Sequence, residues 1–261
     1  MSEYLFFSHY GADPYFNMAF DEYLFSRASK NPGSIYLRLY TWRPGALTFG
    51  RNQRLEKAFN HSALGDTPAI RRITGGRALY HDPSELTYCI TVNQDASIPS
   101  VLENTGAKLG DRIAEGLVAF LLEAGIDSDY VRQSSKRHAD RNFFHTAPCF
   151  ASRARSEIVA TSGKIVASAA YRSGSTILQH GSIKIGGIVS HPALTGVGDG
   201  SKSKVVTSAE FASAAERFRQ CLGKHFVVAF DHGDIAPEDF QALKKRRETI
   251  YRYPFSTRDK F

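Results

Sequence analysis

The chain has 261 residues, of which 42% are hydrophobic and 23% are charged, and its formal net charge is +7 at pH 7. This composition is that of an ordinary globular protein and excludes a disordered chain. The positive charge favours an acidic partner, either a nucleic acid or an acidic protein.

The N-terminal residues 1–9 have no basic segment, no long apolar run and no small-residue cleavage site, which argues against export. No apolar stretch approaches the roughly 20 residues that cross a bilayer. We therefore expect a cytoplasmic protein without a membrane partner.

The three cysteines, Cys89, Cys149 and Cys221, are widely spaced and form no Cys-x-x-Cys pair. In a reducing compartment this pattern indicates free thiols. The nine histidines include no pair at metal-ligand spacing, so we expect no metal site.

The first half of the chain predicts one helix and two adjacent strands. Asp13 and Pro14 are suited to the start of a helix that runs to about Ser29. Residues 34–42 alternate as in a strand, and residues 46–50 predict a second strand after a Pro-Gly turn. These two strands are expected to form a hairpin.

Short strands are expected at residues 69–72 and 86–92, and the second places Cys89 in a structural position. An apolar stripe from Leu109 to Ala124 predicts a long core helix that ends at Gly125. The polar, mostly basic residues 126–148 are expected to form a surface loop.

The second half of the chain predicts an antiparallel meander of three strands, followed by two helices. The strands are residues 156–160, 164–171 and 176–185. Thr207 and Glu210 have the spacing of a capping box, and a helical stripe that adjoins Cys221 follows them. A last helix is expected over about 237–251. No domain boundary is evident, so residues 1–261 are expected to form a single catalytic domain with its core in about 4–226.

Arginines bracket two glycines in the segment 71–78, Arg-Arg-Ile-Thr-Gly-Gly-Arg-Ala. Glycines allow close approach of the backbone to a ligand, and arginines supply charged hydrogen-bond donors. The segment is neither a phosphate-binding P-loop nor a dinucleotide fingerprint. An ordinary Gly-Gly turn on a basic surface is the alternative.

Cys149 follows a proline at the end of the expected surface loop, which is the position of a presented thiol rather than a packed one. Lys164 lies one residue after a tight turn, and by spacing alone it is an exposed turn lysine. A thiolate is a good nucleophile, and a nearby ammonium depresses its pKa.

Several blocks between about Tyr4 and Phe226 resemble, in order, the lipoate-protein ligase and octanoyltransferase family. These blocks are Asp-Pro-Tyr-Phe-Asn-Met-Ala-Phe-Asp-Glu-Tyr-Leu at 13–24, Trp-Arg-Pro at 42–44 with Gly-Arg-Asn-Gln at 50–53, the arginine and glycine segment continued to Asp82, and Ser-Gly-Lys-Ile-Val-Ala-Ser-Ala at 162–169. The resemblance implies the α+β fold of the biotin/lipoate ligase catalytic domain, a mixed to antiparallel sheet flanked by helices.

Two chemistries compete within this family. The ligases activate lipoate with ATP, whereas the cysteine-dependent transferases move octanoate from acyl carrier protein through an acyl-enzyme thioester. Ala-Pro-Cys-Phe at 147–150 and Leu-Gln-His-Gly-Ser-Ile at 178–183 resemble the transferase branch that acts on the glycine-cleavage H protein. The end of the chain near Phe261, without room for a further ligase domain, favours the same branch.

The resemblance implies that Cys149 and Lys164 are the catalytic pair. It implies a substrate-binding set made of Arg71, Arg72, Thr74, Gly75, Gly76, Arg77, Ala78, His81, Ala167, Ser168, Ala169, His180 and Gly181. Backbone N–H groups near Gly75 or Ala167 are candidates for the oxyanion site, and Leu79, Tyr80 and Val166 for the wall of an octanoyl tunnel. No cofactor is implied, and ATP with Mg is needed only by the ligase alternative.

The partners implied are acyl carrier protein as donor and a lipoyl-domain protein, the H protein or a dehydrogenase E2 subunit, as acceptor. An amidotransferase that moves octanoate between lipoyl domains stays open. A hydrolase using Cys149 with His145 or His180, which releases free acid, is a third possibility. A nucleic-acid surface is disfavoured because the basic residues are dispersed and no nucleic-acid motif is present.

Overall fold

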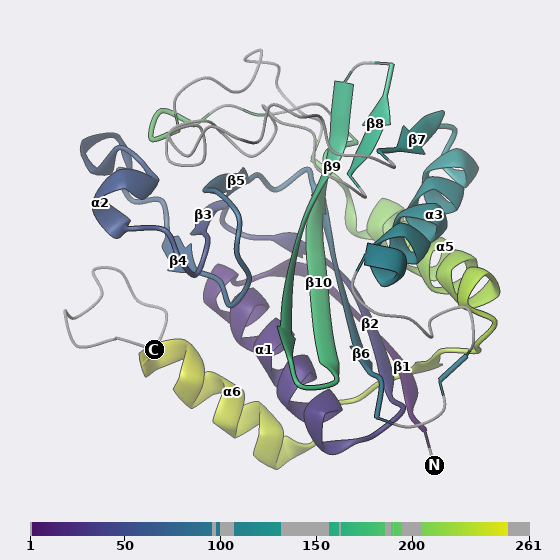
Figure 1. Ribbon diagram of the computed structural model, residues 1–261. Coiled ribbons are helices and arrows are strands. Elements are labelled where there is room, and N and C mark those ends of the chain that lie inside the picture. The colour runs from purple at the N-terminus through teal and green to yellow at the C-terminus, as the bar shows by residue number, and fades with distance from the viewer. Residues whose placement is uncertain are drawn as a thin grey trace.

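The computed structural model describes residues 2–95, 98–99, 107–131, 157–161, 163–185, 189, 191–194 and 205–249. Within these residues, an eight-stranded mixed sheet has the order β11-β1-β2-β6-β10-β9-β8-β7, and a three-stranded sheet has the order β4-β3-β5 (Figure 1). The strands of the large sheet are β1 (Tyr4–Ala12), β2 (Ile35–Trp42), β6 (Leu86–Asn93), β7 (Ser128–Tyr130), β8 (Ile158–Ala160), β9 (Gly163–Ser173), β10 (Thr176–Ile183) and β11 (Asp231–His232). Those of the small sheet are β3 (Ala46–Phe49), β4 (Ala69–Arg71) and β5 (Leu79–His81).

Helices cover both faces of the large sheet. The helices are α1 (Pro14–Lys30), α2 (Leu55–Ala58), the short 3-10 helix η1 (His61–Ala63), α3 (Ala107–Glu123), α5 (Ser208–Phe226) and α6 (Pro237–Thr249). Helices α3 and α5 lie on one side of the sheet, and α1, with α6 packed against it, lies on the other (Figure 1). The expected α+β architecture is confirmed. Among the helices of the described residues, none has the length and apolar character that a membrane span requires.

Strand β6 contributes to a core on each face of the sheet because its side chains alternate. Tyr88 and Ile90 pack in the core beneath α3 and α5, whereas Cys89 packs in the core beneath α1. Cys89 is fully buried and Cys221 is buried on α5, so the structural positions expected for both thiols are confirmed.

The expected hairpin of residues 34–42 and 46–50 is wrong, although both strands exist. Strand β2 pairs with β1 in parallel and with β6 in antiparallel fashion, while β3 pairs with β4 and β5 in the other sheet. Residues Arg43 and Pro44 turn the chain out of the large sheet. The Pro-Gly turn correctly indicates that the chain bends there, but it does not determine which strands pair. Strand β3 cannot pair with β2, because both edges of β2 are occupied by β1 and β6.

Four strands were missed in the sequence: β1, β5, β7 and the two-residue strand β11. In β1, Phe6 and Phe7 are neighbours on opposite faces and both are buried, so the strand lacks the alternation of a half-exposed strand. Strands β5 and β7 are three residues long. Strand β7 lies within residues 126–148, which were expected to form a surface loop, so that expectation is wrong for residues 128–130. Residues 132–148 lie outside the described residues. The antiparallel meander β8-β9-β10 is confirmed.

The start of α5 is held by the capping box that the sequence predicts. The Thr207 side chain accepts from the Glu210 backbone N–H, and the Glu210 carboxylate accepts from the Thr207 backbone N–H. Thr207→Ala is expected to lower the free energy of unfolding by about 1 kcal/mol, measured by urea denaturation. Ser213→Ala, at an exposed position within the same helix, is the control and should change it by less than about 0.5 kcal/mol. Equal effects of the two changes would contradict a role for the cap.

Candidate functional site

A narrow pocket with a volume of about 40 Å³ lies where the middle of β9 and the end of β10 meet the small sheet and the glycine loop. Its lining consists of Met18, Tyr40, Thr48, Arg72, Gly76, Leu79, His81, Thr87, Ala167, Ser168, Ala169, His180, Gly181 and Ser182. These residues come from α1, from both sheets and from the loop after β4. Segments far apart in sequence therefore build one site.

Arg72 shapes the glycine loop from within. Its Nη2 atom donates to the backbone oxygens of Gly75, at 2.7 Å, and Arg77, at 2.8 Å. Gly76 has a φ of +90°, and a Cβ on Gly50 would lie 2.1 Å from the Gly76 oxygen. Glycine at both positions is thus required by the backbone conformation and by the close approach of the two loops.

His180 is held on both ring nitrogens. Its Nδ1 lies 2.9 Å from Oδ2 of Asp21, and its Nε2 lies 2.7 Å from Oγ1 of Thr74. Asp21 also accepts from Arg38 at 2.7 Å and from Tyr40 at 2.9 Å. Burial alone would raise the pKa of Asp21, but the Arg38 guanidinium and His180 lower it. An ionised carboxylate only accepts hydrogen bonds, so His180 donates from Nδ1.

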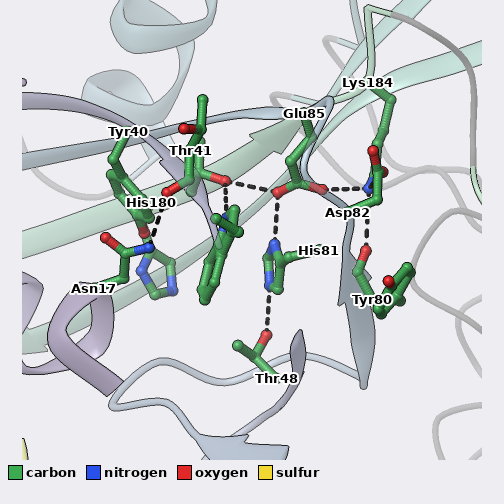
Figure 2. A network of polar contacts seen from close by, with 12 residues as sticks. Asn17, Tyr40, Thr41, Thr48, Tyr80, His81, Asp82, Glu85, His180 and Lys184 are labelled. Carbon is green, nitrogen blue, oxygen red and sulfur yellow. Dashed lines mark hydrogen bonds and ion pairs between the residues drawn. The ribbon is translucent and has the colours of Figure 1, made fainter. Parts of the chain in front are cut away.

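His81 also lines the pocket and is held in the same way, within the network of polar contacts that Figure 2 shows. Its Nδ1 lies 2.6 Å from Glu85 Oε1, its Nε2 lies 2.8 Å from Thr48 Oγ1, and its ring stacks on Trp42 at 4.1 Å. Glu85 is ion-paired with buried Lys184. Burial alone would raise the pKa of Glu85, but Lys184 and His81 lower it to about 2. Burial lowers the pKa of His81.

These contacts form one continuous polar network. Lys184 also binds Asp82 at 2.9 Å and the backbone oxygen of Tyr80 at 3.0 Å. At the other end, Thr48 accepts from Arg72 at 3.2 Å, and Arg72 donates to Thr74 at 3.1 Å. The glycine loop is therefore fixed by a chain of hydrogen bonds that reaches Lys184 on one side and Asp21 on the other.

Lys164 is not the exposed turn lysine that its spacing indicates. Its side chain is buried, and its Nζ lies 2.6 Å from Oε1 of the buried Glu157. The preceding Gly163 has a φ of +115°, which brings the chain into β9. The ammonium of Lys164, paired with the Glu157 carboxylate, lies at the start of the strand that continues into the pocket wall. Cys149 lies outside the described residues.

The structure brings together most, but not all, of the predicted binding residues. Those that line the pocket are Arg72, Gly76, His81, Ala167, Ser168, Ala169, His180 and Gly181. Those that do not are Arg71, Thr74, Gly75, Arg77 and Ala78. Thr74 contacts the lining residue His180, and the Gly75 oxygen accepts from the lining residue Arg72, so both support the lining from outside. Arg71 donates to the backbone oxygens of Arg51 and Gln53. Of the predicted tunnel residues, Leu79 lines the pocket, whereas Tyr80 and Val166 do not.

Sequence reasoning did not single out Asp21, Tyr40, Thr48 or Ser182 as site residues. One usable signal is present: Asn17 and Asp21 are four positions apart on α1, so two polar side chains share the face that packs on the sheet. Both are buried. A buried polar pair on an otherwise apolar helix face indicates a specific polar network. In the described part of the chain, no group of three or more His, Cys, Asp or Glu residues is arranged to hold a metal ion.

The arginine and glycine loop and strands β9 and β10 thus build a pocket into a mixed sheet that is flanked by helices. Residues 13–229 match the family described as the lipoyl protein ligase A/B catalytic domain, and the chain belongs to that family.

Curated relatives carry the name Octanoyltransferase LipM. One from Clostridioides difficile is 36% identical over 169 residues, which cover 64% of this chain and 60% of the relative. Another, from Moorella thermoacetica, is 37% identical over 182 residues, covering 66% and 61% of the two chains. The chain thus spans about three fifths of the length of these relatives.

Solved structures share the fold at lower sequence identity. Protein Ta0514 from T. acidophilum, with bound lipoic acid, has a TM-score of 0.68 at 17% identity, covering 94% of each chain. A lipoate-protein ligase A bound with ATP has a TM-score of 0.66 at 17% identity, covering 95% of this chain and 94% of that one.

Proposed function

We propose that this chain is a cytoplasmic protein N-octanoyltransferase of lipoate biosynthesis. It takes octanoate from acyl carrier protein onto Cys149 as a thioester and passes it to a lysine of a lipoyl-domain protein, such as the glycine-cleavage H protein. The observation that carries the proposal is the 34–37% identity to relatives named Octanoyltransferase LipM. The two solved structures described above, which are named as ligases, are each 17% identical.

The first half-reaction exchanges one thioester for another. The Cys149 thiolate forms a bond to the acyl carbonyl carbon, the bond from that carbon to the donor sulfur breaks, and the donor leaves as a thiol after taking up a proton. The two thioesters are nearly equal in energy, so the step requires no ATP. The Lys164 ammonium, held by Glu157 at 2.6 Å, supports the negative charge that develops on sulfur and oxygen.

The second half-reaction forms an amide. The acceptor lysine, as the free amine, bonds to the carbonyl carbon, the bond to Cys149 sulfur breaks, and one proton leaves the nitrogen. The product is an amide and the thiol is regenerated, so the step runs downhill. In this proposal the pocket between His81 and His180 binds the acyl group, and the hydrogen-bond network keeps the glycine loop in one conformation.

The alternative is an ATP-dependent lipoate-protein ligase. It rests on the fold shared with a ligase that binds ATP. Fold similarity at this identity does not carry activity, because related folds host different chemistries. The amidotransferase differs from our proposal only in the donor, which would be another lipoyl domain.

Intact-mass spectrometry of the purified chain mixed with octanoyl acyl carrier protein, without ATP, tests the proposal. The wild type is expected to gain one octanoyl group, and an apo lipoyl-domain protein should remove it. Cys149→Ala is expected to gain none. Cys221→Ala is the matched control, because this thiol is buried on α5 against α3 and should be dispensable.

An unmodified wild type, with an acceptor that is modified only when ATP and free lipoate or octanoate are present, would establish the ligase instead. Discharge of the thioester to water without an acceptor would indicate a hydrolase. Loading from an octanoylated lipoyl domain but not from acyl carrier protein would identify the amidotransferase.

A further inference from the structure

Almost all polar side chains of the pocket lining are engaged in hydrogen bonds, with one another or with residues behind the lining. Those with a partner are Tyr40, Thr48, Arg72, His81, Thr87, Ser168 and His180. For several of them the capacity is fully used: both ring nitrogens of each histidine are bonded, and Thr87 accepts from Trp42 while it donates to Glu85. Engaged in this way, these groups fix the shape of the pocket.

Ser182 differs from the other side chains of the lining. Its residue is 1% exposed, and its Oγ has no hydrogen-bond partner in the described part of the chain. It lies on β10, paired with Thr87 of β6 and Ala167 of β9, both of which also line the pocket. The unpartnered hydroxyl thus belongs to a residue of the pocket lining, on a strand that is paired along both edges.

A buried hydroxyl without a partner destabilises the folded state, and one that lies in a pocket lining is therefore a candidate for a contact with a ligand. An acyl thioester has one strong acceptor, its carbonyl oxygen, and the alkyl chain has none. When that carbonyl enters a pocket in which most of the other side-chain donors are engaged, it requires a donor that is not. Ser182 Oγ–H is the side-chain donor that meets this need.

We propose that the Ser182 hydroxyl donates a hydrogen bond to the carbonyl oxygen of the acyl group and so takes part in acyl transfer. This inference rests on the proposed octanoyltransferase function. The role is catalytic because the hydroxyl touches the reacting carbonyl, whose oxygen becomes more negative as sulfur or nitrogen adds to the carbon.

The test compares Ser182→Ala with the wild type in a single-turnover reaction with octanoyl acyl carrier protein, followed by intact mass. The rate of thioester formation is expected to fall about 10- to 100-fold, in line with the loss of one donor to a developing oxyanion. The melting temperature should stay the same or rise, because the change removes an unpartnered buried hydroxyl. Ser128→Ala, at another buried unpartnered hydroxyl far from the pocket lining, is the control and should leave the rate unchanged.

A second readout is spectroscopic. Infrared difference spectra of the enzyme loaded with 13C-carbonyl octanoate should show the thioester carbonyl stretch at higher wavenumber in Ser182→Ala, because a hydrogen bond to that oxygen is lost. If the wild type forms the thioester and Ser182→Ala forms it at the same rate with the same carbonyl frequency, the Ser182 inference is overturned while the transferase proposal stands. A wild type that forms no thioester overturns both.

Discussion

Lys184→Met is expected to lower the free energy of unfolding by about 3–5 kcal/mol, the largest effect on stability that we predict. The side chain is buried and pairs with Glu85 and Asp82; burial alone would lower its pKa, but these two carboxylates raise it. Methionine fills a similar volume but leaves both carboxylates without their cation. An uncompensated buried charge costs far more than the pair itself contributes.

Urea denaturation of Lys184→Met measures this effect, and Lys57→Met is the matched control. Lys57 is exposed on α2, so the same substitution there should change stability by less than about 0.5 kcal/mol. The double variant Lys184→Met with Glu85→Gln should recover part of the loss, because it removes one of the two stranded charges. A Lys184→Met chain as stable as the wild type would show that the cluster is hydrated rather than buried.

Acid should destabilise the fold well above the pH at which carboxylates titrate. Burial lowers the pKa of His9 from 6.5 to about 3, with a contribution from the Arg38 guanidinium. Arg38 Nε donates to His9 Nδ1 at 3.2 Å, which requires that nitrogen to be unprotonated. Between pH 6.5 and 3 the unfolded chain therefore holds a proton on His9 that the folded chain does not. Stability is full above pH 6.5 and falls as pH falls through this range.

His9→Gln isolates this contribution, because its side-chain oxygen still accepts from Arg38 and does not titrate. Each differential proton changes the free energy of unfolding by about 1.4 kcal/mol per pH unit. In His9→Gln, the slope of the free energy of unfolding against pH between about 6 and 4.5 should be smaller than in the wild type by about that amount. Burial also lowers the pKa of His81, so part of the slope should remain in the variant. Below pH 4.5, Glu85 adds its own loss as pH falls toward its pKa of about 2.

Chemical denaturation at a series of pH values checks the slope, and an NMR titration of the His9 ring checks its cause. The ring signals of the folded wild type should stay those of the neutral form down to pH 4.5. Identical slopes for the wild type and His9→Gln would show that His9 is protonated in the folded state.

Local signals in the sequence correctly predicted the elements whose cause is local. The Asp13-Pro14 helix start, the Thr207 capping box and the alternation of β6 each depend on neighbours within a few residues. Strand partners depend on residues far away, so the hairpin after Trp42 was predicted wrongly. Strand β1 was missed because its neighbouring residues Phe6 and Phe7, which lie on opposite faces, are both buried.

In the candidate site, too, local features could be predicted from the sequence and long-range contacts could not. The arginine and glycine segment could be predicted as a ligand-binding loop from the sequence. Glycine allows the backbone to approach a ligand closely, and arginine supplies charged hydrogen-bond donors. The Asp21, His180 and Thr74 contacts join α1, β10 and the loop after β4. No spacing rule connects positions about 160 residues apart, so the pairing was beyond single-sequence reasoning.

The sequence by itself determined the helix caps, the order of strands in the meander, the glycine loop and, through its resemblance, the family. Tertiary structure alone decided that β2 and β3 separate into two sheets, that Lys164 is buried with Glu157, and that Ser182 is the pocket hydroxyl without a partner. The physical reason is that caps and turns are satisfied within a few residues of backbone. Burial and hydrogen-bond satisfaction, by contrast, are properties of every side chain that packs nearby, and only the folded chain brings those side chains together.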